Sequence, residues 1–354
     1  MLSNELNANH EVSILYPVFP DFTLLRCMRN PPSVAGYIKK CLIDLTALLK
    51  SPYWRYAHLL HEKVKVKAYW GPKISSRAFR GADVAVYFSA YQALELAQVQ
   101  PQLQHMVYYV LHDQSMSDAH FVDPAIISAT YHNRDRKIAL SGRTAERLQM
   151  IGVRVEAIIP GGVADSLFHS VGRENSNHLS ILAYYWPGEP RKGSSGLLDI
   201  LRSVRKRYPD VKVSLLTPPG VRIRDFSTYS NLNEQALAEL YRAHSIFVFP
   251  SAYEGFGLPP LEAMACGCAV IATKVGAVEE YARHGYSALL CDPGKLDQME
   301  EALQAFLGSP ELVARLAANA VKEAQGWTWR QAGMKMDAFL RSLDLRNGST
   351  LPVV

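Results

Sequence analysis

Short apolar runs alternate with helical patterns along most of the chain, and this alternation restricts the folds that it can adopt. Each run is rich in β-branched or aromatic residues and is followed by a stretch long enough for a helix. This order is typical of parallel strands joined by crossover helices, so it predicts an α/β fold with a doubly wound sheet. In the first half the runs cover residues 12–16, 64–69, 83–88, 106–111, 137–140 and 155–159.

A second series of runs begins after a polar bridge at residues 170–177, which predicts two sheets in sequence. A chain of 354 residues, 48% of them hydrophobic, is long enough for two ordinary cores. We therefore expect one domain over residues 1–168, a second over 169–327, and a final segment 328–354 with a helix from about Arg330 to Leu343. The later runs cover residues 179–184, 211–216, 246–249, 269–272 and 288–290.

The turn that follows the run 246–249 predicts a phosphate site. It carries Gly255 and Gly257 and leads into a helix with proline in its first turn, where a missing N–H costs nothing. The unsatisfied N–H groups of a helix N-terminus attract a diphosphate, and glycine lets the backbone approach it. We therefore expect the backbone from Gly255 through Phe256 and Gly257 to Leu258 to contact the phosphates.

Two glutamates bracket this turn, with seven residues between them. Glu254 precedes the glycines and Glu262 is expected in the first helical turn, so both can face a ligand at the helix N-terminus. Glu262 suits the hydroxyls of a ribose, as acidic residues do at other dinucleotide sites. Glu254 would then reach the hydroxyls of a transferred sugar, and the predicted ligand is a nucleotide sugar.

Composition argues against membrane-spanning, secreted and metal-binding proteins. No run of 18 or more apolar residues occurs, and the N-terminus lacks a basic region followed by an apolar core, so we expect a soluble cytoplasmic protein. The five cysteines suit reduced buried thiols better than a disulfide framework. Cys266 and Cys268 form a CxC pair rather than a spaced zinc set, so no metal site is expected.

The net charge of +5 is carried by local clusters of basic residues. Lys63, Lys65 and Lys67 alternate with valines, and a second cluster closes a helix at residues 202–207. Solvated faces are the favoured interpretation. The alternative is attraction to an anionic membrane that carries a lipid-linked acceptor, or to another acidic acceptor; nucleic acid is not favoured as the partner.

An ordered series of motifs resembles the retaining glycosyltransferases of family 4, within the glycosyl transferases group 1. Its centre runs from Pro250 to Thr273 and includes both glutamates and Cys266-Gly267-Cys268. The resemblance implies the GT-B architecture, with two Rossmann-like doubly wound domains facing across a cleft and the last helix crossing back to the first domain. It extends from about residue 106 to 290, is strongest over 245–290, and includes the motifs at 141–148, 159–163, 275–280 and 284–290.

Two further loops are predicted to contact the ligand. Residues 186–193 form the first strand-to-helix turn of the second domain, where open α/β sheets bind ligands, so Arg191 and Lys192 are expected to meet phosphate oxygens. The family has an arginine five residues before this lysine, whereas this chain has Pro187, so Arg191 replaces that arginine or one contact is lost.

The second loop follows the run 106–111 and contains His112. His112 resembles the histidine of the family's acceptor-side domain and would contact a sugar hydroxyl or influence proton transfer.

The N-terminal region departs from the family pattern. It has no glycine-rich loop after the first apolar run, and Gly36 is the candidate for that role. Because acceptor recognition lies in this region of the family, the sequence does not predict the acceptor.

The resemblance implies a retaining enzyme of polysaccharide biosynthesis that transfers a sugar from a nucleoside diphosphate sugar to a glycan, lipid-linked or other hydroxyl acceptor. No Asp-x-Asp motif occurs, so the reaction is expected to need no obligatory metal, and the donor is a substrate rather than a bound cofactor. Two alternatives stay open. One is a catalytically silent partner subunit with the same fold, and the other is a phosphorylase or sugar-phosphate synthase on the same scaffold.

Overall fold

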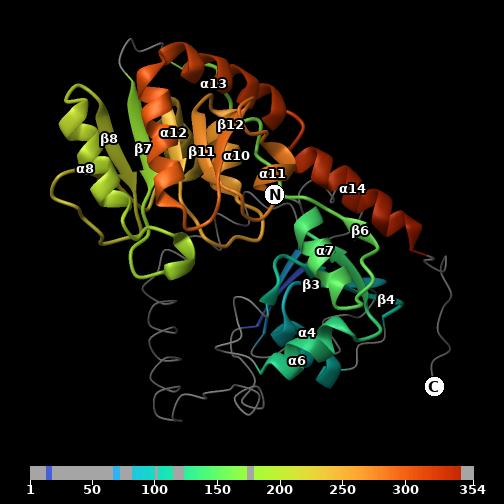
Figure 1. The fold of residues 1–354 in the computed structure, drawn as a ribbon. Helices are drawn as coiled ribbons and strands as arrows, with labels where there is room; N and C mark the ends of the chain where they lie inside the picture. Colours follow the sequence, from blue (N-terminus) through green and yellow to red (C-terminus); the bar gives the residue numbers. More distant parts are fainter. Residues whose placement is uncertain are drawn as a thin grey trace, which may run out of the picture. The chain divides into compact units, whose positions relative to one another are not determined.

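The structure, a computed structural model, describes residues 13–17, 67–71, 82–99, 103–114, 123–173 and 179–343 (Figure 1). Gly36, Cys27, Cys41, Lys63 and Lys65 lie outside these residues. The described chain divides into two compact units. The first contains the residues up to Ile159 except Ser141–Arg143, together with those from Gly333 onward, and the second contains Ser141–Arg143 and Pro160–Ala332.

The first unit contains a parallel sheet with the strand order β3-β4-β5-β6. The order of the strands matches their order in the sequence, as expected for strands joined by crossover helices. The strands are β3 (Val84–Tyr87), β4 (His105–Val110), β5 (Arg136–Ala139) and β6 (Ala157–Ile158); β1 (Ser13–Pro17) pairs in parallel with β2 (Lys67–Gly71). The helices are α4 (Ala90–Val99), α6 (Pro124–Tyr131) and α7 (Gly142–Met150).

Successive residues of β4 face opposite sides of this sheet, and helices cover both sides. Tyr108 lies at the centre of one side, with its ring 4.7 Å from that of Tyr87 and 5.8 Å from that of Tyr131 on α6. Tyr109 points the other way, into a cluster with residues of α14 (Trp329–Ser342) that include Phe339. The parallel, two-sided arrangement that the sequence predicts is therefore present in this unit.

The second unit contains a parallel sheet of six strands in the order β12-β11-β10-β7-β8-β9. The chain starts at β7, moves outward to β8 and β9, and returns to place β10 on the other side of β7. The bounds are β7 (Ser180–Tyr184), β8 (Lys212–Leu216), β9 (Ser227–Tyr229), β10 (Ile246–Phe249), β11 (Ala269–Thr273) and β12 (Ala288–Cys291). The strand order reverses between β7 and β10, and such switch points are where open α/β sheets bind ligands.

Helices cover both faces of this second sheet (Figure 1). Apolar residues of α8 and α12 form one cluster with inward residues of β7, β8, β10 and β11. On the opposite face Tyr241 of α9 packs edge-on against Phe247 of β10, with ring centroids 5.2 Å apart. The helices are α8 (Leu197–Arg207), α9 (Glu234–Arg242), α10 (Leu258–Ala265), α11 (Val278–Tyr281), α12 (Leu296–Gly308) and α13 (Pro310–Ala324), with a short 3-10 turn η3 (Pro190–Lys192).

Local sequence signals explain where several of these helices begin. Ser309 caps α13 by accepting from the N–H of Leu312 at 3.2 Å, and Pro310 occupies the first helical position. Asn233 caps α9 in the same way. Within the described parts of the chain, no helix has the length and apolar character that crossing a bilayer requires.

Candidate functional site

The loops that follow β7 and β10 meet at the switch point of the second sheet. The carbonyl oxygen of Arg191 accepts hydrogen bonds from the N–H groups of Ala252, at 2.7 Å, and Tyr253, at 3.1 Å. Gly193 has a φ of +61°, and a Cβ there would lie 2.0 Å from the carbonyl oxygen of Pro250. Only glycine allows this approach, so the two loops form one packed edge of the site.

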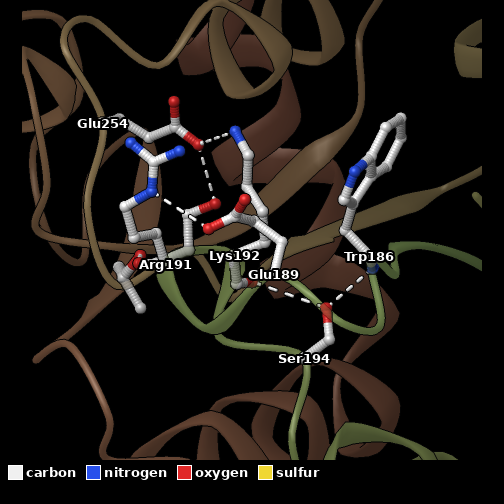
Figure 2. A network of polar contacts seen from close by, with 8 residues as sticks. Trp186, Glu189, Arg191, Lys192, Ser194 and Glu254 are labelled. Atoms are coloured by element: carbon white, nitrogen blue, oxygen red, sulfur yellow. Dashed lines mark hydrogen bonds and ion pairs between the residues drawn. The ribbon is translucent and has the colours of Figure 1, made fainter. Parts of the chain in front are cut away.

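A partly buried polar network joins these loops through side chains (Figure 2). The Nζ of Lys192 lies 2.7 Å from Oε1 of Glu254, and the side chains are 25% and 16% exposed. The hydroxyl of Ser251 donates to the same carboxylate oxygen at 2.8 Å. Ser251 is fully buried and its carbonyl oxygen accepts the hydroxyl of Thr273, so three strand ends fix the position of Glu254.

Arg191 occupies a more open place than its neighbour Lys192. Its Nε donates to Oε1 of Glu189 at 3.0 Å, and both side chains are more than one third exposed. This hydrogen bond holds the pKa of Glu189 below its usual value. The structure thus brings Lys192 to Glu254, while the predicted contact of Arg191 with phosphate stays a prediction.

The N-terminus of α10 presents a small number of backbone donors. Gly257 is the N-cap residue with a φ of +91°, and the helix begins at Leu258. Pro259 and Pro260 have no N–H, and the N–H of Leu261 is the first that can bond back to the carbonyl of Gly257. The amides of Gly257 and Leu258 are therefore the donors that this turn offers to an anion.

Phe256 contributes to the packing beneath this turn. Its side chain is only 4% exposed, and its ring lies 5.7 Å from the ring of Tyr281 and 6.0 Å from that of Trp327. Any contact of Phe256 with a ligand would therefore come from its backbone, as the sequence predicts for this position.

Glu262 lies one residue further into the helix than predicted. Because α10 begins at Leu258, Glu262 opens the second turn, and the first turn contains no acidic residue. Its Oε2 accepts a hydrogen bond from the hydroxyl of Tyr241 at 3.3 Å. The pKa of Glu262 is raised to about 7, mainly by burial, and the charge of Glu234 acts in the same direction.

His112 belongs to the first unit, where it follows β4 and is partly buried. The next residue, Asp113, forms an ion pair with Arg147 at 3.1 Å. The role predicted for His112 toward the acceptor stays a prediction.

The cysteines of the second unit are packed in its interior. Cys266, Cys268 and Cys291 are free and buried, in agreement with the predicted reduced thiols. Burial raises the pKa of the Cys266 thiol to about 12, so it is protonated near neutral pH. Among the described residues, no three side chains of the His, Cys, Asp and Glu types gather as a metal site.

Ser251 and Tyr281 contact the predicted site, although they are not among the site residues that the sequence predicts. Ser251 directly follows β10, and a buried serine at the carboxyl end of a strand beside a ligand loop is a usable signal. The hydroxyl of Tyr281 donates to the carbonyl of Gly257 at 2.5 Å, a contact that no local pattern indicates.

Comparisons with known proteins support a transferase site in this unit. Residues 225–323 match the family model of the glycosyl transferases group 1. Over 137 residues the chain is 36% identical to D-inositol 3-phosphate glycosyltransferase of Rhodococcus opacus. The aligned residues make up 38% of this chain and 29% of that protein. Over 187 residues it is 33% identical to MMP alpha-(1->4)-mannosyltransferase of Mycolicibacterium hassiacum. These residues make up 49% of this chain and 45% of that protein. The chain thus matches less than half of the length of these relatives.

Solved structures extend the likeness to both units. Sucrose-phosphate synthase of Thermosynechococcus elongatus aligns with 97% of this chain and 91% of its own, with a TM-score of 0.68 at 19% identity. HepE of Anabaena, in complex with UDP-glucose, aligns with 82% and 89%, with a TM-score of 0.67 at 18% identity. At these identities the likeness concerns the fold, and it confirms the predicted GT-B class. The second unit thus matches the glycosyl transferases group 1 over residues 225–323, and the chain as a whole has a GT-B fold.

Proposed function

We propose that this protein is a retaining glycosyltransferase that moves a sugar from a nucleoside diphosphate sugar to a hydroxyl acceptor without an obligatory metal. The observation that carries the proposal is the placement of Lys192 and Glu254, 2.7 Å apart, beside the N-terminus of α10 at the switch point of the second sheet. A cation, backbone amides and a carboxylate are the groups that a diphosphate and a sugar hydroxyl require.

In the proposed reaction the diphosphate leaves the anomeric carbon while the acceptor hydroxyl approaches the same face. The ammonium of Lys192 and the amides of Gly257 and Leu258 stabilise the negative charge that develops on the leaving diphosphate. Glu254, fixed by Ser251 at 2.8 Å, orients the donor sugar and supports oxocarbenium character at its ring. An oxygen of the β-phosphate takes the proton of the acceptor hydroxyl, and the new glycosidic bond forms as the bond to the diphosphate breaks.

The names of the relatives support the proposed substrates. HepE was solved with UDP-glucose, and two curated relatives are named for transfer to an inositol phosphate and for mannosyl transfer. The UDP-glucose bound in HepE supports a nucleoside diphosphate sugar as the donor proposed for this chain. The acceptor is proposed as a glycan or lipid-linked hydroxyl, with a peripheral contact to an anionic membrane and a cytoplasmic location as accompanying predictions.

A panel of UDP, GDP and TDP sugars, incubated with hydroxyl acceptors, tests the proposal by the release of nucleoside diphosphate. The anomeric configuration of the product, measured by NMR spectroscopy, should match that of the donor. Turnover should persist in excess EDTA. Inversion of the anomeric centre, or loss of turnover in EDTA that Mn²⁺ or Mg²⁺ restores, would contradict the corresponding part of the proposal.

Two further measurements, turnover of the same donors with phosphate acceptors and binding of the nucleotides, separate the two alternatives that the sequence left open. A phosphorylase or sugar-phosphate synthase would require inorganic phosphate or a sugar phosphate as the acceptor. A silent partner subunit would bind a nucleotide without turnover of any donor.

A further inference from the structure

The helix α11 and the residue before it contact the backbone of the phosphate turn at two consecutive residues. The N–H of Ala277 donates to the carbonyl oxygen of Phe256 at 2.8 Å. The hydroxyl of Tyr281, at the end of α11, donates to the carbonyl oxygen of Gly257 at 2.5 Å. The peptide units 256–257 and 257–258 are thus both held through their carbonyl groups.

A held carbonyl also fixes the direction of the N–H in the same peptide unit. The peptide group is planar and trans, so its N–H points opposite to its C=O. The bond from Ala277 therefore sets the direction of the N–H of Gly257, and the bond from Tyr281 sets that of the N–H of Leu258. These are the two amides that the turn offers to a diphosphate.

Glycines make this close contact possible on both sides. Gly276 has a φ of +55°, and a Cβ there would lie 2.7 Å from the carbonyl oxygen of Phe256. Gly257 has a φ of +91°, and a Cβ there would lie 3.2 Å from the hydroxyl oxygen of Tyr281. A side chain at either position would push the two segments apart.

The ring of Tyr281 is immobilised by its surroundings. Tyr281 has no exposed surface, and its ring lies 5.7 Å from that of Phe256 and 5.9 Å from that of Trp327. Burial, together with the charges of Glu254, Glu262 and Glu280, raises the pKa of this phenol well above its usual value. The hydroxyl therefore keeps its proton and remains a donor over the neutral pH range.

We infer that Tyr281 is a positioning residue, which aims the Leu258 amide at the diphosphate by holding the carbonyl of Gly257, with Gly276 and Ala277 performing the same task for the Gly257 amide. The inference rests on the proposed function of this turn. It gives α11 a role in recognising the phosphates of the donor, separate from the recognition of its base.

The test compares the binding of a nucleoside diphosphate with that of its nucleoside. UDP, GDP and TDP are titrated calorimetrically into the wild-type protein, and the one that binds most tightly is used with the matching nucleoside. Tyr281→Phe removes the hydroxyl and keeps the ring. We expect it to weaken diphosphate binding about tenfold, the effect of one lost hydrogen bond, and to leave nucleoside binding within about twofold.

Tyr109→Phe is the matched control. Tyr109 is 2% exposed, and its hydroxyl donates to the carbonyl of Ile159 at 2.5 Å, so the same buried bond is lost in the first unit. This variant should bind both ligands as the wild type does. Thermal melts of the two variants show whether they lose stability to a similar extent.

Gly276→Ala provides a second route to the same result, because its methyl group would displace the carbonyl of Phe256. Gly152→Ala is its control, since Gly152 has a φ of +79° and no atom lies within 4 Å of a Cβ placed there. Gly276→Ala should lose affinity for the diphosphate, whereas Gly152→Ala should bind it as the wild type does.

Equal loss of diphosphate and nucleoside binding in Tyr281→Phe, or no loss of either, would overturn the inference while leaving the proposed function intact. If the wild-type protein bound none of the three diphosphates, the proposed function itself would be wrong, and the inference with it.

Discussion

The two glutamates that bracket the phosphate turn lie in regions of different character. Glu254 lies in a loop at the edge of the sheet, where a lysine ammonium at 2.7 Å and a serine hydroxyl at 2.8 Å contact the same oxygen. Glu262 lies inside α10, where it accepts a hydrogen bond from the neutral hydroxyl of Tyr241 at 3.3 Å. The same residue type is therefore placed beside a positive charge in one region and beside an uncharged hydroxyl in the other.

This difference assigns the two residues different tasks. Glu254 lies 2.7 Å from the ammonium of Lys192, a placement that suits a group that orients a sugar and faces positive charge at its ring. Burial favours the protonated form of Glu262, so its ability to accept hydrogen bonds depends on pH. Variants at the two positions should accordingly fail in different ways.

The largest effect is expected for Glu254→Gln. The amide keeps the size of the side chain but removes its charge, so we expect transfer to fall by about a thousandfold, in the range measured when one preorganised electrostatic contact is removed. Donor turnover, measured by the release of nucleoside diphosphate, gives the result.

Glu156→Gln is the matched control for this change. Glu156 forms an ion pair with Arg136 at 2.7 Å in the first unit, and its side chain is 25% exposed. This variant should turn over donor as the wild type does. Turnover near the wild-type rate in Glu254→Gln would remove Glu254 from the mechanism.

A smaller effect is expected for Lys192→Ala. Loss of the ammonium leaves Glu254 beside the leaving diphosphate without its counter-charge, so we expect kcat/KM for the donor to fall about a hundredfold. The comparison variant is Arg191→Ala, one residue earlier in the same 3-10 turn, whose partner Glu189 is exposed. It should lose less than Lys192→Ala, because the Arg191 side chain is 45% exposed and solvent weakens its attraction for a phosphate. Equal losses in the two variants would show that both cations meet the diphosphate.

The fold is predictable from the sequence where strands are continuous apolar runs. All four residues of β10 are buried, and their run is evident in the sequence. The strand β9 (Ser227–Tyr229) is not evident in the sequence, because it is short and polar and lies at the edge of the sheet, where burial imposes no apolar pattern.

The candidate site is predictable in its parts but not in its contacts. Helix-start signals locate the turn at Gly257, and the order of strands and helices identifies the loop that contains Lys192 as a ligand loop. The ion pair between Lys192 and Glu254 depends on β10 lying directly beside β7, which is a property of the strand order. The contact of Tyr281 depends on packing between segments distant in sequence, so no local pattern predicts it.

The smallest effect concerns the pH dependence of Glu262. Its pKa of about 7 means that the carboxylate form decreases as pH falls from 8 to 6, and only the carboxylate offers both oxygens to the hydroxyls of a ribose. Affinity for a nucleoside should therefore fall by at most about tenfold over this range, as measured by calorimetry. In Glu262→Gln the affinity should be low and nearly independent of pH.

The raised pKa of Glu262 also predicts how the stability of the protein depends on pH. This dependence can be measured without a ligand, so titration of a ligand does not affect it. Because its pKa is raised on folding from 4.5 to about 7, the folded protein binds the proton more tightly than the unfolded chain. The stability that this proton contributes is present below pH 4.5 and is lost as pH rises to about 7, by at most about 3 kcal/mol. Denaturant unfolding at pH 5 and pH 8 should show a smaller decrease for Glu262→Gln than for the wild type. An identical decrease in both proteins would mean that Glu262 is charged in the folded state over this whole range, and that burial does not keep it protonated.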